Sequence, residues 1–293
     1  MSGEILDIPE DAYHRDDVAD VPTLSKSIAH ILLTQSAAHA FAAHPKLNPQ
    51  AVQKEEHKFD VGTAAHALLL EGVDAVQVVA ADDWRTKAAK EARDEARAAG
   101  RIPLLSKHWE GVQAMVAAIR PQLAEHEASP PLFTDGKAEQ TLVWDEDGVV
   151  CKARLDWLRD DHQAIDDLKS TGASASPEAW SKTMLGFGGD LQVAMYLRGA
   201  RAVLGRTPAF RFVTVELVPP YALTVFSLAP DALALADAKL EYAIATWRQC
   251  LRTGVWPAYP RRVCYVQAPP WGEAQWADRE YRDTEITTER TAA

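Results

Sequence analysis

The stretch VVCKARLDWLRDDHQAIDDLKST, residues 149–171, decides the fold of this chain. Its two halves, 149–158 and 163–169, are rich in residues that favour β-strands, and a polar Arg-Asp-Asp-His turn separates them. The segment 137–145 also has the character of a strand, and an Asp-Gly turn joins it to the first half. The sequence therefore predicts a three-stranded antiparallel meander.

Charged side chains gather on one face of this predicted hairpin. Because side chains alternate across a strand, Lys152, Arg154 and Asp156 share a face of the first strand. Asp167 and Lys169 share a face of the second strand. Converging carboxylates suit a hard cation such as Mg²⁺ or Mn²⁺, and a nearby ammonium can orient or deprotonate water and stabilise charge at phosphorus. The pattern predicts phosphodiester hydrolysis; the alternative is an exposed hairpin with a cross-strand ion pair.

Earlier segments supply further candidate residues. Glu139 adds a carboxylate if its face of the preceding strand points toward the same site, and otherwise it is an exposed strand glutamate. His66 lies in a predicted helix and is either a metal ligand or a histidine satisfied within the core. Ser25 or Ser27 caps a predicted helix over 28–43, where hydroxyls and free N–H groups either bind a phosphate or only cap the helix.

The segment after the hairpin predicts a helix, two strands and a second helix. The first helix, 190–204, is amphipathic, and Gln192 and Tyr196 lie on one of its faces because they are four residues apart. The remaining elements are predicted at 210–217, 222–228 and 230–253. The chain order is therefore helices, three strands, helix, two strands, helix.

Composition limits the classes of function. The chain has 293 residues, of which 47% are hydrophobic and 25% charged, so it is long enough to bury a sizeable core. Its net charge of −11 argues against coating nucleic acid with a uniformly basic surface, but leaves room for a locally basic groove. The acidic N-terminus lacks a signal-peptide pattern, and the sequence has no run of eighteen apolar residues, so no membrane role is expected.

The cysteines indicate the compartment. Cys151, Cys250 and Cys264 are widely spaced and odd in number, which favours neither a disulfide framework nor a zinc or iron–sulfur site. A reducing cytoplasm is the expected location.

Together these motifs resemble the αβββαβ core of PD-(D/E)XK exonucleases. Within that superfamily the chain resembles the exonuclease VIII (RecE-type) branch, and more distantly lambda-type exonuclease and RecB nuclease domains. The residues that carry the resemblance are Leu24-Ser25-Lys26-Ser27, Gly62-Thr63-Ala64-Ala65-His66, Glu139, Asp156, Asp167-Leu168-Lys169 and Gln192 to Tyr196. Each motif is weak alone, but their shared order along the chain supports the resemblance.

The resemblance implies a restriction-endonuclease-like α/β fold, a mixed central sheet flanked by helices with an N-terminal helical region. It implies one domain over 1–277, with the helical part at 22–130 and the catalytic core at 137–253. The polar residues 278–293 are expected to form a disordered tail.

The resemblance also implies a metal site. His66, Asp156, Asp167 and the backbone carbonyl of Leu168 are expected to hold one or two Mg²⁺ ions, with Mn²⁺ as a substitute. Lys169 is expected to activate the attacking water.

Other residues are implied to handle water and DNA. Glu139 would orient water or a second ion, and Gln192 and Tyr196 would position the nucleotide at the scissile phosphate. The residues expected to grip the DNA end are Ser25, Lys26, Ser27 and Arg154. A locally basic channel would draw on Lys26, Arg85, Lys87, Lys152 and Arg154.

The implied activity is a Mg²⁺-dependent exodeoxyribonuclease acting on linear double-stranded DNA from 5′ to 3′. It would leave 3′ tails for a RecT-type annealing protein in phage-type recombination. The protein would form a homo-oligomer, such as a tetrameric ring, and would prefer 5′-phosphorylated ends. Two alternatives stay open: an endonuclease or single-strand nuclease of the same fold, and a non-catalytic module that binds DNA ends.

Overall fold

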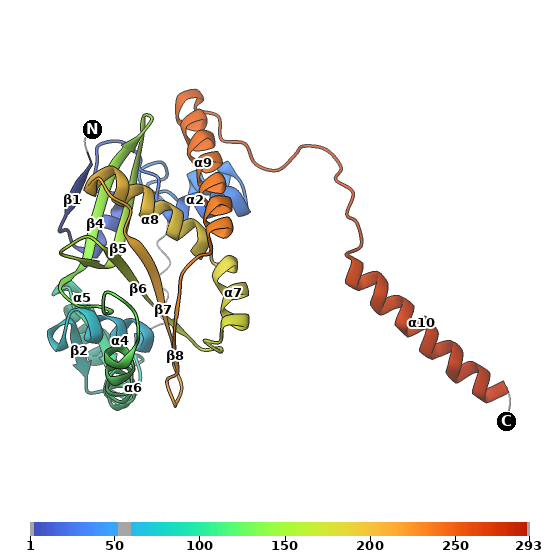
Figure 1. Ribbon diagram of the computed structural model, residues 1–293, viewed down its shortest axis with the longest axis horizontal. Coiled ribbons are helices and arrows are strands. Elements are labelled where there is room, and N and C mark those ends of the chain that lie inside the picture. Colours follow the sequence, from blue (N-terminus) through green and yellow to red (C-terminus); the bar gives the residue numbers. More distant parts are fainter. Residues whose placement is uncertain (1–2, 52–59, 292–293) are drawn as a thin grey trace. The chain divides into compact units, whose positions relative to one another are not determined.

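The computed structural model describes residues 3–51 and 60–291 (Figure 1). The chain divides into a compact unit, Met1–Pro257, and a second unit, Ala258–Ala293. The second unit contains α10 (Pro270–Thr291). Among the described residues, no helix combines the length and the apolar character needed to span a bilayer.

The centre of the first unit is a six-stranded mixed sheet with the order β1-β4-β5-β6-β7-β8. Neighbouring strands are antiparallel except for the parallel pair β6 and β7. The strands are β1 (Glu4–Leu6), β4 (Gly136–Glu146), β5 (Val149–Arg159), β6 (Ala164–Thr171), β7 (Ala209–Glu216) and β8 (Leu223–Phe226). The predicted meander and the mixed sheet are confirmed.

The hairpin opens toward one end of the sheet. In the described register, β5 and β6 pair only at Trp157↔Asp166 and Leu158↔Ile165, close to the turn. Farther on, the amide of Leu168 donates to Oδ2 of Asp156 at 2.9 Å. The Asp156 carboxylate thus accepts a hydrogen bond that a backbone carbonyl of β5 would otherwise accept, and the backbone ladder between the two strands ends before this point.

Helices cover one face of the sheet (Figure 1). They are α2 (Lys26–Thr34), α3 (Ala37–Ala43), α7 (Pro177–Gly186), α8 (Gly189–Leu204) and α9 (Pro230–Thr253). Their apolar side chains form one core with the sheet, including the fully buried Trp144, Phe212 and Trp247. Burying such a side chain contributes about 1.5–3 kcal/mol. Gly199 of α8 lies against Trp144 so closely that a Cβ would overlap the ring.

The other face carries a second core. It is formed by α4 (Asp60–Leu70) and α6 (Ser106–Glu125) packed against β7, with Val112, Val213 and Val215 fully buried. A small parallel sheet adjoins these helices. Its strands are β2 (Val76–Val79) and β3 (Ile102–Leu105), and η2 (Val73–Ala75) and α5 (Lys87–Ala98) belong to the same part of the chain.

Three segments differ from the sequence prediction. The single helix predicted over 28–43 is two helices, because Oγ of Ser36 caps α3 by accepting from the His39 amide. The segment before residue 22, where the sequence predicted no helix or strand, contains β1 and α1 (Glu10–Arg15), the latter with acids in its first turn and bases in its last. The tail predicted to start at 278 begins inside α10, where helix-favouring residues continue across that position.

Candidate active site

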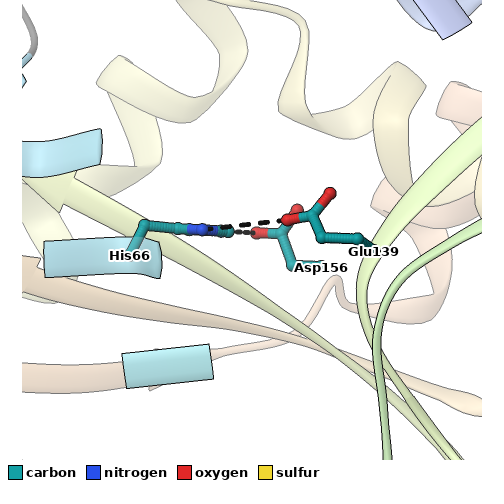
Figure 2. A group of neighbouring side chains, drawn as sticks. All are labelled: His66, Glu139 and Asp156. Atoms are coloured by element: carbon teal, nitrogen blue, oxygen red, sulfur yellow. Dashed lines mark ion pairs between the residues drawn. The ribbon is translucent and has the colours of Figure 1, made fainter. Parts of the chain in front are cut away.

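Three side chains from three elements meet at the open end of the hairpin (Figure 2). His66 comes from α4, Glu139 from β4 and Asp156 from β5. Nε2 of His66 lies 3.1 Å from Oδ2 of Asp156, and Nδ1 lies 3.8 Å from Oε1 of Glu139. One ligand atom from each residue falls within 4.8 Å of the other two. All three side chains are partly buried.

Glu139 reaches this cluster because its backbone is unusual. Its φ is 58°, in the left-handed region, and the pairing of β4 with β5 skips it between Ala138↔Trp157 and Gln140↔Leu155. A non-glycine residue in this region costs about 1–3 kcal/mol, so surrounding contacts must hold it. The register is the same on both sides of Glu139, so Glu139 and Asp156 form an unpaired position in the ladder, and the Glu139 carboxylate lies toward His66.

Asp167 and Lys169 lie beside the cluster on β6. Asp167 is fully buried; its Oδ2 accepts from Nε2 of Gln192, and its Oδ1 pairs with Nζ of Lys169. The same Nζ lies 3.9 Å from Oδ2 of Asp156. The structure therefore brings Asp156, Asp167 and Lys169 together, as the alternation of side chains predicts.

The pKa values reflect acids crowded in a buried place. Burial, followed by the charge of Asp156, raises the pKa of Asp167 to about 7. Burial and Asp156 also raise the pKa of Glu139. Burial opposes ionisation of Asp156, but Lys169 and His66 outweigh it and hold the pKa of Asp156 below its ordinary value. Burial likewise lowers the pKa of His66, yet Asp156 and Glu139 raise it overall.

This donor set fits a divalent cation. One imidazole nitrogen and two carboxylates suit Mn²⁺, and the carboxylates suit Mg²⁺. Among the described residues, Glu139 completes the group of close ligand atoms, although the resemblance assigned it only to water or a second ion. Asp167 is not one of the three, and its two oxygens contact Gln192 and Lys169.

Gln192 and Tyr196 lie on the face of α8 that points at the site. Both are buried, and Gln192 binds Asp167, while Tyr196 packs edge-on against Phe210 with ring centroids 5.9 Å apart. Burial, followed by the charge of Asp167, raises the pKa of Tyr196 well above its ordinary value, so its phenol stays protonated. Their contact with a nucleotide stays a prediction, as does the role of the Leu168 carbonyl.

The serine motif surrounds the start of α2. Oγ of Ser25 accepts from the amide of Ile28 at 3.4 Å and caps the helix. Lys26 turns toward the loop before α8, where its Nζ donates to the carbonyl of Phe187 at 2.8 Å. Burial, followed by the charge of Lys169, lowers the pKa of Lys26 to about 8.

A pocket of about 310 Å³ adjoins this motif. The polar residues that line it are Tyr13, His14, Ser25, Ser27, His44 and Lys152. Ser25 and Ser27 thus share a pocket, whereas Lys26 makes its hydrogen bond outside that lining.

Four of the bases that were expected to line a channel contact acidic groups instead. Lys152 is buried, with Nζ 2.6 Å from Oδ1 of Asp16. Arg154 binds Glu139, and Arg85 and Lys87 form surface ion pairs with acidic neighbours. Asp16 was not predicted from the sequence; the acidic-to-basic order across α1 is the signal that would have shown a helix there.

Comparisons with known proteins show the family and the fold of this chain. Residues 26–269 match the family described as a PDDEXK-like domain of unknown function (DUF3799). A crystallised protein from Eubacterium rectale, named as a putative exonuclease, superposes with a TM-score of 0.58 and 14% identity. That match covers 90% of this chain and 97% of the other, and such low identity compares the fold alone.

A second solved structure, that of SSO0001, gives a TM-score of 0.27 at 13% identity. It covers 71% of this chain and 98% of the other, and it is too dissimilar to support an argument. No curated protein matches the chain.

Proposed function

We propose a reaction for this chain from one premise: it belongs to the family of PDDEXK-like domains. The reaction is the metal-dependent hydrolysis of phosphodiester bonds in DNA. One observation carries the proposal, namely that Asp156, Asp167 and Lys169 converge beside His66 and Glu139 where β5 and β6 separate. The complete set of charged groups argues against a non-catalytic module.

The chain's own residues have separable tasks in this reaction. A divalent cation held by His66, Glu139 and Asp156 would polarise the phosphate and lower the pKa of a water molecule. Burial lowers the pKa of Lys169, but Asp167 and Asp156 raise it overall, so the ammonium stays charged. Lys169 is therefore suited to orient water and to stabilise charge at phosphorus.

Digestion of linear and circular duplex DNA tests the reaction. With Mg²⁺ or Mn²⁺ the parent protein is expected to degrade the linear form, and with EDTA it is not. Lys169→Ala is expected to abolish digestion, while Lys107→Ala, which removes an exposed lysine of α6, is expected to keep it. If a folded Lys169→Ala protein digests DNA as the parent does, the proposed reaction is wrong.

We further propose that the enzyme is an exonuclease that works from 5′ to 3′ and leaves 3′ tails, as the RecE-type resemblance implies. Duplexes labelled separately at each 5′ and 3′ terminus test this polarity. Early release of the 3′ label contradicts it, and cutting of circular DNA favours the endonuclease alternative.

The pocket beside α2 is the proposed grip for a 5′-phosphorylated end. Ser25 and Ser27 offer hydroxyls, and the first turn of a helix favours an anion. Ser27→Ala avoids the capping serine, and it is expected to reduce the preference for 5′-phosphate over 5′-hydroxyl ends. An unchanged preference argues that the end is held elsewhere.

A homo-oligomer is proposed because attraction to phosphate alone would not retain a chain of net charge −11 on DNA. A ring, such as a tetramer, would enclose the duplex and pass its product to a RecT-type annealing protein. Light scattering tests the assembly, and a monomer that digests processively contradicts it.

A further inference from the structure

The N-terminal segment contacts the face of the sheet that carries the site. Nη1 of Arg154 donates to the carbonyl of Ile8 at 2.8 Å. Nζ of Lys152 donates to the carbonyl of Tyr13 and to Oδ1 of Asp16, both at 2.6 Å. Lys152 and Arg154 of β5 thus anchor a segment that precedes the family match, which begins at residue 26.

Arg154 also contacts the site directly. Its Nε donates to Oε2 of Glu139 at 2.6 Å, and its Nη1 lies 3.5 Å from Oγ1 of Thr141. Only 14% of its side chain is exposed. A guanidinium has a rigid planar set of donors, so a group that fixes one edge also fixes the direction of the other.

Glu139 needs such a constraint. Its φ of 58° is unfavourable for a glutamate, and its second oxygen, Oε1, faces His66. β1 pairs with β4 immediately beyond, at Leu6↔Thr141. The N-terminal segment therefore contacts β4 close to Glu139 and also contacts the guanidinium that binds Glu139.

We propose that Arg154 is a positioning residue, and that the N-terminal segment acts on the site through it. The carbonyl of Ile8 orients the guanidinium, and the guanidinium aims the Glu139 carboxylate at the cation that His66 and Asp156 share. This inference rests on the proposed metal-dependent function. It replaces the expected role of Arg154 as a contact to DNA phosphate.

Mn²⁺ affinity separates the two roles without relying on catalysis. Calorimetric titration of Arg154→Gln is expected to show Mn²⁺ binding at least about tenfold weaker than in the parent, because partners that orient a ligand typically affect affinity by about 10–100-fold. In digestion assays kcat is expected to fall while KM for DNA stays within about twofold. Unchanged Mn²⁺ affinity with a raised KM and a shallower salt dependence would overturn the proposal, because that pattern marks a phosphate contact.

Arg159→Gln is the matched control. Arg159 lies on the same strand, but its guanidinium binds Asp161 and Thr134 away from the site. The control is expected to bind Mn²⁺ as the parent does. If the parent itself binds no Mn²⁺, the proposed function fails; if the parent binds and Arg154→Gln binds equally well, only this inference fails.

Two further variants keep the test decisive if Arg154→Gln does not fold. Arg154→Lys retains the charge, but one ammonium cannot reproduce both edges of the guanidinium, so intermediate Mn²⁺ affinity is expected. Deletion of residues 1–9 removes the Ile8 carbonyl and should weaken Mn²⁺ binding in the parent but add little to Arg154→Lys. Parent-like affinity in Arg154→Lys, or fully additive losses, would overturn the proposal.

Discussion

Asp167 is a carboxylate in a place that disfavours its charge. Burial and Asp156 raise its pKa to about 7. In the unfolded chain the same group ionises near pH 4, at its ordinary pKa of about 3.9. Between these values the folded protein holds more protons than the unfolded chain, so this contribution to stability is complete at low pH and is lost as the pH rises through 7. In the metal-free protein, ionisation of Asp167 therefore lowers the free energy of unfolding at and above about pH 7.

Replacing Asp167 with asparagine should recover that stability. Without metal at pH 8, Asp167→Asn is expected to unfold at a higher temperature than the parent, by about 2–4 °C for each kcal/mol recovered. The gain should shrink toward pH 4, and added Mg²⁺ should stabilise the variant less than the parent. Thermal unfolding with EDTA at several pH values measures this; a lower midpoint than the parent at pH 8 contradicts it.

His66 should matter to the metal more than to the fold. Its imidazole lies 3.1 Å from Asp156, within a group of three potential ligands. His66→Ala is expected to weaken Mn²⁺ binding by at least about tenfold while the protein still folds. His108→Ala, on α6, is the control. Unchanged Mn²⁺ affinity, or a variant that fails to fold, would indicate that His66 is a core histidine and not a metal ligand.

Single residues were predictable where a strict period applied. Alternation along β6 placed Asp167 and Lys169 on one side of the strand, and the structure has them in contact. Glu139 was harder to predict, because its direction depends on a left-handed φ and on Arg154, which binds it from the neighbouring strand. No local pattern in the sequence indicates a left-handed φ at this position.

Among the elements, α8 depends most on one residue at its start. Gly188 has a φ of 72°, its carbonyl accepts from the Gln192 amide at 3.1 Å, and a Cβ there would overlap the ring of His30. Gly205 ends the same helix with a φ of 68°, and a Cβ at this position would meet nothing within 4 Å. Both glycines have a positive φ, but only at Gly188 would a Cβ meet another side chain.

These two glycines form a matched pair for mutation. Gly205→Ala is expected to cost about 1 kcal/mol from backbone strain alone. Gly188→Ala should cost about 1–3 kcal/mol more, because α2 and α8 must move apart. Only Gly188→Ala should also lower kcat, since it displaces Gln192 from Asp167. Equal losses of stability and equal activities would show that the contact with His30 does not position α8.

Element types were predictable and element ends were less so. The long helices and the meander have strong periodicity, whereas β1 has only three residues and gains its stability from pairing with β4. The break between α2 and α3 depends on Ser36, a residue that also occurs inside helices.

At the scale of the whole molecule, the C-terminal boundary differs from the expected one at 277. The compact unit ends at Pro257, and from there to residue 283 the described side chains are almost all exposed, including Tyr265 and Trp271. The expected boundary was placed where the sequence becomes polar, at residue 278, but polarity along the chain does not show where packing ends.

Trp256 and Pro257 mark where the chain stops contributing to the core. The ring of Trp256 packs against Trp247 and Phe41, with centroids 5.0 and 5.2 Å away, and the carbonyl of Pro257 accepts from the amide of Ala38 at 3.1 Å. A chain shortened to residues 1–258 keeps all of these contacts. A chain shortened to residues 1–254 loses every one of them.

The two truncations should therefore behave differently although they differ by four residues. The 1–258 protein is expected to unfold within about 2 °C of the full chain, a change of less than about 1 kcal/mol. The 1–254 protein is expected to lose about 2–4 kcal/mol, because a partly buried tryptophan and a backbone hydrogen bond disappear together. Thermal unfolding of the three proteins decides this. A large fall in the midpoint of the 1–258 protein would mean that residues beyond the compact unit stabilise it. Equal midpoints for the two truncations would mean that Trp256 does not contribute to the stability of the core.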